Sequence, residues 1–118
     1  MDNYYSIILR FFKVYNWGMS MKDLQKRAYE NKVKHGFNLE DINFEFCLLY
    51  GEVGEAYHAW LMKEDGLGSE LADVGIYLLG LSEMLGIDLG EEIQKKMAIN
   101  EKRVYRRAEN GVLVKDEN

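Results

Sequence analysis

The chain contains no proline among its 118 residues, whereas average usage of roughly 5% would give about six. Because proline kinks or ends helices, its absence favours long, uninterrupted helices. Glycines mark the expected breaks instead, among them Gly36, Gly66, Gly86 and Gly111. Since no segment sustains the alternation of apolar and polar residues that is typical of strands, we predict an all-α fold, a bundle of the four-helix type.

Capping signals place the ends of these helices. Ser20 is the expected first N-cap, with Asp23 at the third helical position, and Ser69 and Asp88 are the expected N-caps of the last two helices. We expect the four helices over residues 21–35, from 39 or 41 to 63, over 70–85 and from 89 onwards.

Composition narrows the class of protein. The chain is 47% hydrophobic and 30% charged, and its formal net charge of -5 argues against nonspecific attraction to nucleic acid or to an anionic membrane. We therefore predict neither a nucleic acid polymer nor a membrane as partner. A single cysteine, Cys47, excludes an intramolecular disulfide; it is expected in the core and indicates a reducing, cytoplasmic compartment.

Three segments are expected along the chain. Residues 1–18 are aromatic and apolar but carry Asp2, Arg10 and Lys13, so they lack the run of about 20 apolar residues that a membrane span needs. We assign residues 1–18 to an N-terminal extension whose role stays open, and residues 19–108 to one helical domain. Residues 109–118 form a tail that we expect to be either frayed or a short extended piece.

The third helix is apolar on every side between Leu71 and Leu81. A helix that is apolar all round is normally buried, so we predict that it forms the core. Gly75 and Gly80 each cost roughly 1 kcal/mol within a helix, and we expect them to allow close helix approach. So small a bundle with such a helix is expected to self-associate.

Four acids interrupt the apolar faces of two helices. Glu52 and Glu55 occupy positions on the second helix where its apolar stripe would otherwise continue. Glu70 and Asp73 lie at the start of the third helix. Close carboxylates repel by up to about 4 kcal/mol per pair at an effective dielectric constant of 20. Either the acids are protonated, or they face water, as such pairs commonly do on solvated helices, or a cation lies between them. An oxygen-only ligand set suits Mg²⁺ or Mn²⁺ better than zinc.

A family resemblance rests on three motifs. "EVGE", then after fourteen residues "ELADVGIYLLGLSEMLGIDL", then "KKMAINEKR" resemble the MazG-like, all-α nucleoside triphosphate pyrophosphohydrolases over residues 24–106. The resemblance implies Mg²⁺-dependent hydrolysis of a nucleoside or deoxynucleoside triphosphate between the α and β phosphates, giving the monophosphate and pyrophosphate in nucleotide pool housecleaning, with Mn²⁺ as a substitute ion. Relatives are homodimers or homotetramers, which is the expected assembly here.

The resemblance also assigns roles to residues. The metal ligands would be Glu52, Glu55, Glu70 and Asp73, and the substrate-binding residues Tyr77, Lys96 and Asn100. A water would attack the α-phosphorus in line, with Glu52 or Glu55 as general base; we favour Glu55. The number of ions stays open, since Tyr50 and Gly51 stand where many relatives carry another acid.

The fourth helix offers a partner for the polyphosphate. Lys96, Asn100, Arg103 and Arg107 follow one another at helical spacing, so we expect them on one basic face, although such a face can also be merely solvated. Base recognition stays open. Its candidates, each of which can instead be a core residue, are His35, Phe37, Phe44 and Trp60.

Two other classes of function fit parts of the sequence. One is a noncatalytic helical module that binds a protein or senses nucleotide, in which the acids would be dispensable. The other is a di-iron carboxylate bundle, because His58 follows Glu55 by three residues, a pattern used in such sites. That site would need a second copy of the motif, from a symmetric partner.

Overall fold

The computed structural model describes residue 3, residues 6–7 and residues 18–116. Most of the predicted N-terminal extension therefore lies outside the described residues. The described part contains four helices and one two-stranded sheet, which are α2 (Met21–His35), α3 (Ile42–Leu61), α4 (Leu67–Met84), α5 (Leu89–Lys102), β1 (Tyr105–Arg107) and β2 (Leu113–Lys115). The predicted all-α class is confirmed.

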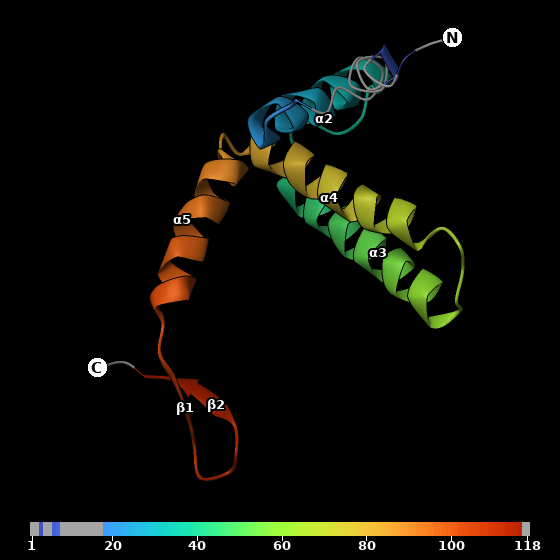
Figure 1. Ribbon diagram of the computed structural model, residues 1–118. Coiled ribbons are helices and arrows are strands. Elements are labelled where there is room, and N and C mark those ends of the chain that lie inside the picture. Colours follow the sequence, from blue (N-terminus) through green and yellow to red (C-terminus); the bar gives the residue numbers. More distant parts are fainter. Residues whose placement is uncertain (1–2, 4–5, 8–17, 117–118) are drawn as a thin grey trace.

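The centre of the fold is a helical hairpin. α3 and α4 lie side by side and are joined by a short loop, and α2 packs across α4 near the end of α4 (Figure 1). α5 then leads away from the hairpin and packs against α2 (Figure 1). At that contact a Cβ on Gly90 would come within 3.2 Å of the Met21 Cβ, so glycine lets the two helices approach closely.

Most of the predicted helix ends are observed. The Ser20 and Asp23 side chains form a reciprocal capping box, and the Asp88 carboxylate accepts a hydrogen bond from the Glu91 N–H at 3.1 Å. Ser69 is not the N-cap of α4: the helix begins two residues earlier, at Leu67, after Gly66. No side chain caps that end, and glycine is itself tolerated at the N-cap position.

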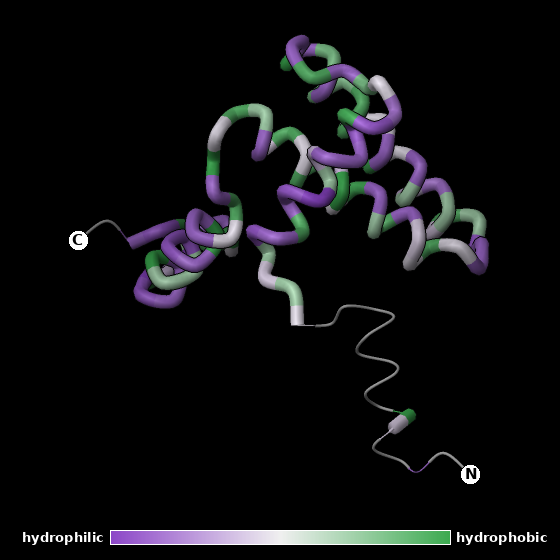
Figure 2. Tube along the Cα trace, turned by 90° about the horizontal axis from the view of Figure 1, so that it is seen from above, coloured by the Kyte–Doolittle hydropathy of each residue, from purple (hydrophilic) through white to green (hydrophobic). Residues whose placement is uncertain are grey.

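The core of a single chain is small. Ala56, Ala59 and Leu81 are its fully buried apolar residues within the described part. The prediction that α4 is buried all round is wrong for one chain, because α2 and α3 cover only part of it, and Leu71 remains 57% exposed. Cys47 is also exposed rather than in the core. Figure 2 shows hydrophobic and hydrophilic residues mixed along the helices.

The two glycines of α4 differ in role. A Cβ on Gly80 would come within 3.1 Å of the Lys32 side chain, whereas one on Gly75 would meet nothing within 4 Å. The expected close approach therefore holds at Gly80, where the side chain of Lys32 crosses α4, and not at Gly75.

After α5 the chain forms a β-hairpin. Its second strand lies in the tail that was expected to be frayed or briefly extended, but the pairing of this strand with β1 was not predicted. β1 pairs with β2 in antiparallel register, with Tyr105 opposite Lys115. The pairing therefore joins the end of the expected helical domain, residues 19–108, to the expected tail, residues 109–118. The prediction that Arg103 and Arg107 continue the face of α5 is wrong: the helix ends at Lys102, Arg103 is extended, and Arg107 lies in β1. Within the described residues, no helix is long and apolar enough to cross a membrane.

Candidate metal centre

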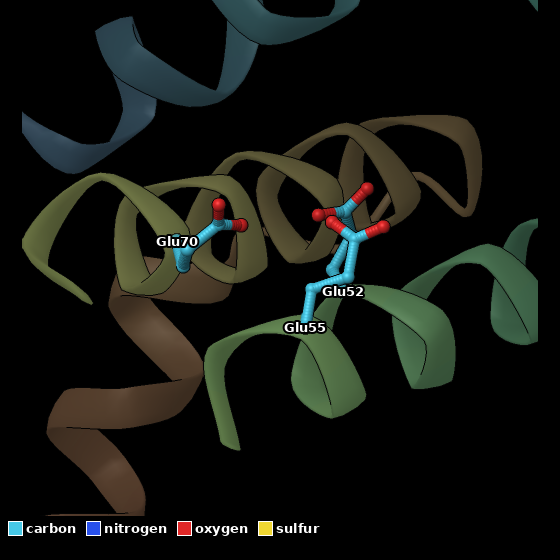
Figure 3. Close-up of side chains that lie close together, drawn as sticks. All are labelled: Glu52, Glu55 and Glu70. Atoms are coloured by element: carbon cyan, nitrogen blue, oxygen red, sulfur yellow. The ribbon is translucent and has the colours of Figure 1, made fainter. Parts of the chain in front are cut away.

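Three of the four predicted acids meet between α3 and α4. Carboxylate oxygens of Glu52, Glu55 and Glu70 all lie within 4.8 Å of one another. Figure 3 shows the Glu52 and Glu55 side chains rising from α3 towards α4, the helix that carries Glu70. One helical turn separates Glu52 from Glu55, so both project from the same side of α3. The hairpin thus brings Glu70 of α4 next to the acidic pair of α3, from which it is distant in sequence.

Glu52 is the most constrained of these acids. Its Oε2 atom is buried and has no hydrogen-bond partner within the described residues. Burial raises the pKa of the Glu52 carboxyl above its ordinary value of 4.5, and the negative charges of Glu55, Asp73 and Glu70 raise it further. A buried oxygen without a donor is costly unless a cation or a proton binds it.

Asp73 and Tyr77 extend the site along α4. Asp73 is not within the 4.8 Å group, but its negative charge contributes to the raised pKa of Glu52. Tyr77 follows one turn later and is partly buried. Burial first, and then the charge of Glu52, raises the pKa of the Tyr77 phenol. Its hydroxyl therefore stays protonated near neutral pH and can donate a hydrogen bond.

Beside Tyr77 lies a buried ion pair that sequence reasoning missed. The Lys32 ammonium of α2 contacts the Glu45 carboxylate of α3, and the other Glu45 oxygen accepts a hydrogen bond from Asn38 Nδ2 at 3.0 Å. Glu45 is only 1% exposed and Lys32 8%. A signal existed, because Glu45 precedes Glu52 by seven residues and so continues the same face of α3.

Lys96 and Asn100 are not brought to the acids within one chain. Both are exposed residues of α5, which leads away from the α3–α4 hairpin (Figure 1). They share a side of their helix at a spacing of four residues, and α5 packs mainly against α2 rather than against the two helices that carry the acids.

The aromatic candidates and His58 occupy different surroundings. Phe37 and Phe44 line cavities next to Tyr77, whereas Trp60 stacks near Tyr57 in a separate apolar groove. His58 lies outside the cluster, and its Nε2 is 3.8 Å from a Glu64 carboxylate oxygen instead. The cluster therefore lacks the histidine that a di-iron site of the expected pattern requires.

Two curated relatives match part of this chain. A dATP/dGTP diphosphohydrolase of Salmonella phage PMBT28 is 50% identical over 42 residues, and one of cyanophage S-2L is 48% identical over 44 residues. These matches cover 36% and 37% of this chain, and 14% and 42% of the respective relatives. The chain thus matches less than half of the length of either relative. No family model matches the chain.

A solved structure matches nearly the whole fold. It is described as the cyanophage S-2L MazG-like pyrophosphohydrolase bound to dGDP and three catalytic Mn²⁺ ions per active site. The TM-score is 0.61 and the sequence identity 30%, and the match covers 83% of this chain and 98% of the other. Identity at this level over almost all of the other chain shows common ancestry as well as a common fold. The chain belongs to the MazG-like pyrophosphohydrolase family.

Proposed function

We propose that this protein hydrolyses a nucleoside or deoxynucleoside triphosphate between the α and β phosphates, giving the monophosphate and pyrophosphate. The observation that carries the proposal is the unpartnered, buried Glu52 Oε2 atom, which lies among the carboxylates of Glu55 and Glu70. The dATP/dGTP diphosphohydrolases and the Mn²⁺-bound relative support the same reaction class. We assign the activity to the cytoplasm, where the nucleotide pools are.

The donor set fits a hard divalent cation. Carboxylate oxygens are the preferred ligands of Mg²⁺ and Mn²⁺, and no histidine or cysteine belongs to the cluster formed by the described residues. Glu52, Glu55, Glu70 and Asp73 would hold the ion, with Mg²⁺ as the expected cofactor and Mn²⁺ as a substitute. When bound, the cation offsets charge on the phosphates and lowers the pKa of a water molecule.

Residues of the chain activate the water and bind the nucleotide. The attacking water adds to the α-phosphorus, the α–β P–O bond breaks, and pyrophosphate leaves with the bonding electrons. Glu55 is exposed, so a water can reach its carboxylate, which accepts the water's proton as general base. Glu52, more enclosed, is the second candidate base. The protonated Tyr77 hydroxyl donates to a phosphate or sugar oxygen of the nucleotide.

We further propose that the protein is a homodimer or homotetramer and that Lys96 and Asn100 act across its interface. Support comes from an apolar groove on the α3–α4 hairpin, whose lining includes Trp60 and Leu71, 61% and 57% exposed in a single chain. A second copy would cover such residues. α5 leads away from the α3–α4 hairpin of its own chain (Figure 1), so its Lys96 and Asn100 would bind the polyphosphate at a neighbouring subunit's site.

The activity is tested by a substrate screen. The common ribo- and deoxyribonucleoside triphosphates are incubated with the protein and Mg²⁺ or Mn²⁺, and pyrophosphate is measured separately from orthophosphate. The proposal predicts stoichiometric pyrophosphate and monophosphate from at least one substrate, and none with EDTA. Orthophosphate as the first product would indicate cleavage at another bond, and no turnover of any substrate would favour the noncatalytic, nucleotide-sensing alternative.

A further inference from the structure

Gln25 of α2 is a buried residue that is hydrogen-bonded to α4, to α5 and to the connection between them. It is only 3% exposed. Its Nε2 donates to a Glu83 carboxylate oxygen of α4 at 2.8 Å and to the Ile87 carbonyl at 2.6 Å. Its Oε1 accepts from the N–H of Leu89, the first residue of α5, at 3.1 Å. Both N–H donors and the oxygen of the amide are therefore engaged by the protein itself.

These bonds lie where the chain turns from α4 into α5. Residues 85–88 form this connection. Gly86 has a positive φ of 67°, and the Ile87 N–H donates to the Ser82 carbonyl at 2.9 Å, which closes the end of α4. Such bonds are local to the connection, whereas Gln25 ties both of its sides to a third helix.

In a single chain α5 is held mainly at its first turn. Within the described residues it packs against α2, and its contact with α3 or α4 is at most marginal. The other contacts with α2 lie at the same end: Met21 packs against Gly90, and the Lys22 ammonium is 3.9 Å from an Asp88 carboxylate oxygen. The rest of α5 leads away from the other helices (Figure 1). The direction of α5 is therefore set at this joint.

A small rotation at the joint produces a large displacement further along α5. Lys96 and Asn100 lie seven and eleven positions after Leu89, which is about 10 and 16 Å along the helix axis. A tilt of about 10° at the joint would move them by roughly 2 and 3 Å. A misplacement of about 1 Å can lower an enzymatic rate by about 100-fold. The precision of the joint thus matters for any reaction that uses these two residues.

We propose that Gln25 is a positioning residue for the pyrophosphohydrolase reaction: it fixes the direction of α5 and so places Lys96 and Asn100 at the nucleotide of a neighbouring subunit. This inference rests on the proposed function, which assigns Lys96 and Asn100 to the substrate. Gln25 itself does not touch the nucleotide, because its amide is buried and fully engaged within its own chain.

The direction of α5 can be measured without any turnover. Nitroxide labels are attached to Glu30→Cys on α2 and Glu101→Cys on α5, both exposed positions, in a Cys47→Ser background. An excess of unlabelled protein ensures that the distances lie within one subunit. Double electron–electron resonance should give one narrow distance distribution, and Gln25→Met should broaden or shift it by at least about 2 Å.

Gln94→Met is the matched control for the same change of side chain. Gln94 is an exposed residue of α5, two positions from Lys96 and therefore about 200° away around the helix. We expect its distance distribution and its rate of pyrophosphate release to equal those of the wild type. Circular dichroism verifies that every variant is folded.

Turnover then separates positioning from a merely structural role. With Mn²⁺ and the best substrate, Gln25→Met should lower the rate of pyrophosphate release by about 10- to 100-fold. In Lys96→Ala/Asn100→Ala the same change should cost less than about 2-fold, because the residues that Gln25 positions are gone. A residue that only stabilises the fold would lower both rates by the same factor. Mn²⁺ binding, measured by calorimetry, should be unchanged, because the acids lie on α3 and α4.

A second set of variants tests the bond to Glu83 while preserving side-chain size. Gln25→Glu places two carboxylates against each other, and their repulsion should disturb the joint. Gln25→Glu/Glu83→Gln restores an amide–carboxylate pair with donor and acceptor exchanged. The double variant should release pyrophosphate about 3- to 10-fold faster than Gln25→Glu. This comparison decides the matter if Gln25→Met does not fold.

Other results overturn the inference. An unchanged distance distribution in Gln25→Met, equal losses of rate in the two backgrounds, or no recovery in Gln25→Glu/Glu83→Gln would each contradict a positioning role. Turnover by the wild type in those cases leaves the proposed function standing. Absence of turnover of every triphosphate by the wild type contradicts the proposed function itself, and the positioning role with it.

Discussion

Carboxylate oxygens of Glu52 on α3 and Glu70 on α4 lie within 4.8 Å of each other, although eighteen positions separate the two residues in the sequence. Their repulsion destabilises the contact between α3 and α4, and a bound cation would reverse the sign of that contribution. The stability of the hairpin should therefore depend on divalent ions.

Saturating Mn²⁺ or Mg²⁺ should raise the thermal midpoint of unfolding. A ligand that binds only the folded state at 100 times its dissociation constant adds about 2.7 kcal/mol to the free energy of unfolding. Differential scanning calorimetry with and without each ion measures the shift. In Glu70→Gln the shift should shrink sharply, because one ligand from α4 is lost. Identical midpoints for the wild type with and without both ions would argue strongly against a metal site.

The metal-free protein should lose stability as pH rises. The pKa of Glu52 is raised in the folded state above its ordinary value of 4.5, so between these two values the folded state binds more protons than the unfolded state, and the free energy of unfolding falls. The contribution is fully present below the ordinary pKa and is lost as pH rises through the folded pKa. Urea titrations in EDTA measure this slope.

Two comparisons assign that slope to the acidic cluster. Glu52→Gln, which cannot titrate at this position, should reduce it. Saturating Mn²⁺ should oppose it, since the ion binds the ionised carboxylates. A slope in EDTA that is the same for Glu52→Gln and the wild type would place its origin elsewhere.

The buried pair Lys32–Glu45 should respond asymmetrically to substitution. Lys32→Met leaves the Glu45 carboxylate buried without its cation, which typically costs about 3 to 5 kcal/mol of unfolding free energy, whereas replacing both partners by apolar residues costs much less. Chemical denaturation of Lys32→Met and of Lys32→Met/Glu45→Leu compares the two. Lys95→Ala is the matched control, because its ion pair with Glu91 is exposed and worth at most about 0.5 kcal/mol. Equal losses for the single and double variants would contradict a coupled pair.

Lys96 offers a test of a site shared between subunits. Lys96→Ala should weaken turnover without unfolding the protein, since its side chain is exposed on α5. If Lys96 acts on a neighbouring subunit's nucleotide, mixing Lys96→Ala with Glu55→Gln should recover part of the activity, because some mixed assemblies contain one intact site. Size-exclusion chromatography with light scattering establishes the assembly. Full activity of Lys96→Ala would assign the residue to a solvated face.

Local signals predicted the helices well because each acts within a few residues. The capping box at Ser20, the N-cap at Asp88 and the left-handed Gly36 depend on neighbours in the sequence, and they were predictable. Ser69 was the exception. Two residues before it Leu67 already begins α4, and the preference of serine for the N-cap was not strong enough to set the helix start.

The candidate site was predictable only in part because its parts depend on tertiary packing. Helical spacing put Glu52 beside Glu55, and the two acidic pairs on apolar faces suggested that α3 and α4 meet. The partner of Glu45 could not be found in this way, since Lys32 reaches it from α2 across Gly80. The end of α5 at Lys102 was also missed, because the strand pairing that follows it is nonlocal.

The central claim is that the acids between α3 and α4 exist to hold a catalytic cation, and Glu55→Gln tests it most directly. The variant keeps the side-chain shape and removes one negative charge, so the metal-free protein should be as stable as the wild type or more stable. Glu30→Gln, the same change at an exposed acid of α2, serves as the control for both stability and activity.

The decisive measurement is the rate of pyrophosphate release by Glu55→Gln with Mn²⁺ and the best substrate. Loss of a metal ligand and of the proposed general base should lower this rate by at least about 100-fold relative to the wild type, while Glu30→Gln remains near the wild-type rate. Turnover by Glu55→Gln close to that of the wild type would contradict the assignment of the acidic cluster and the mechanism built on it.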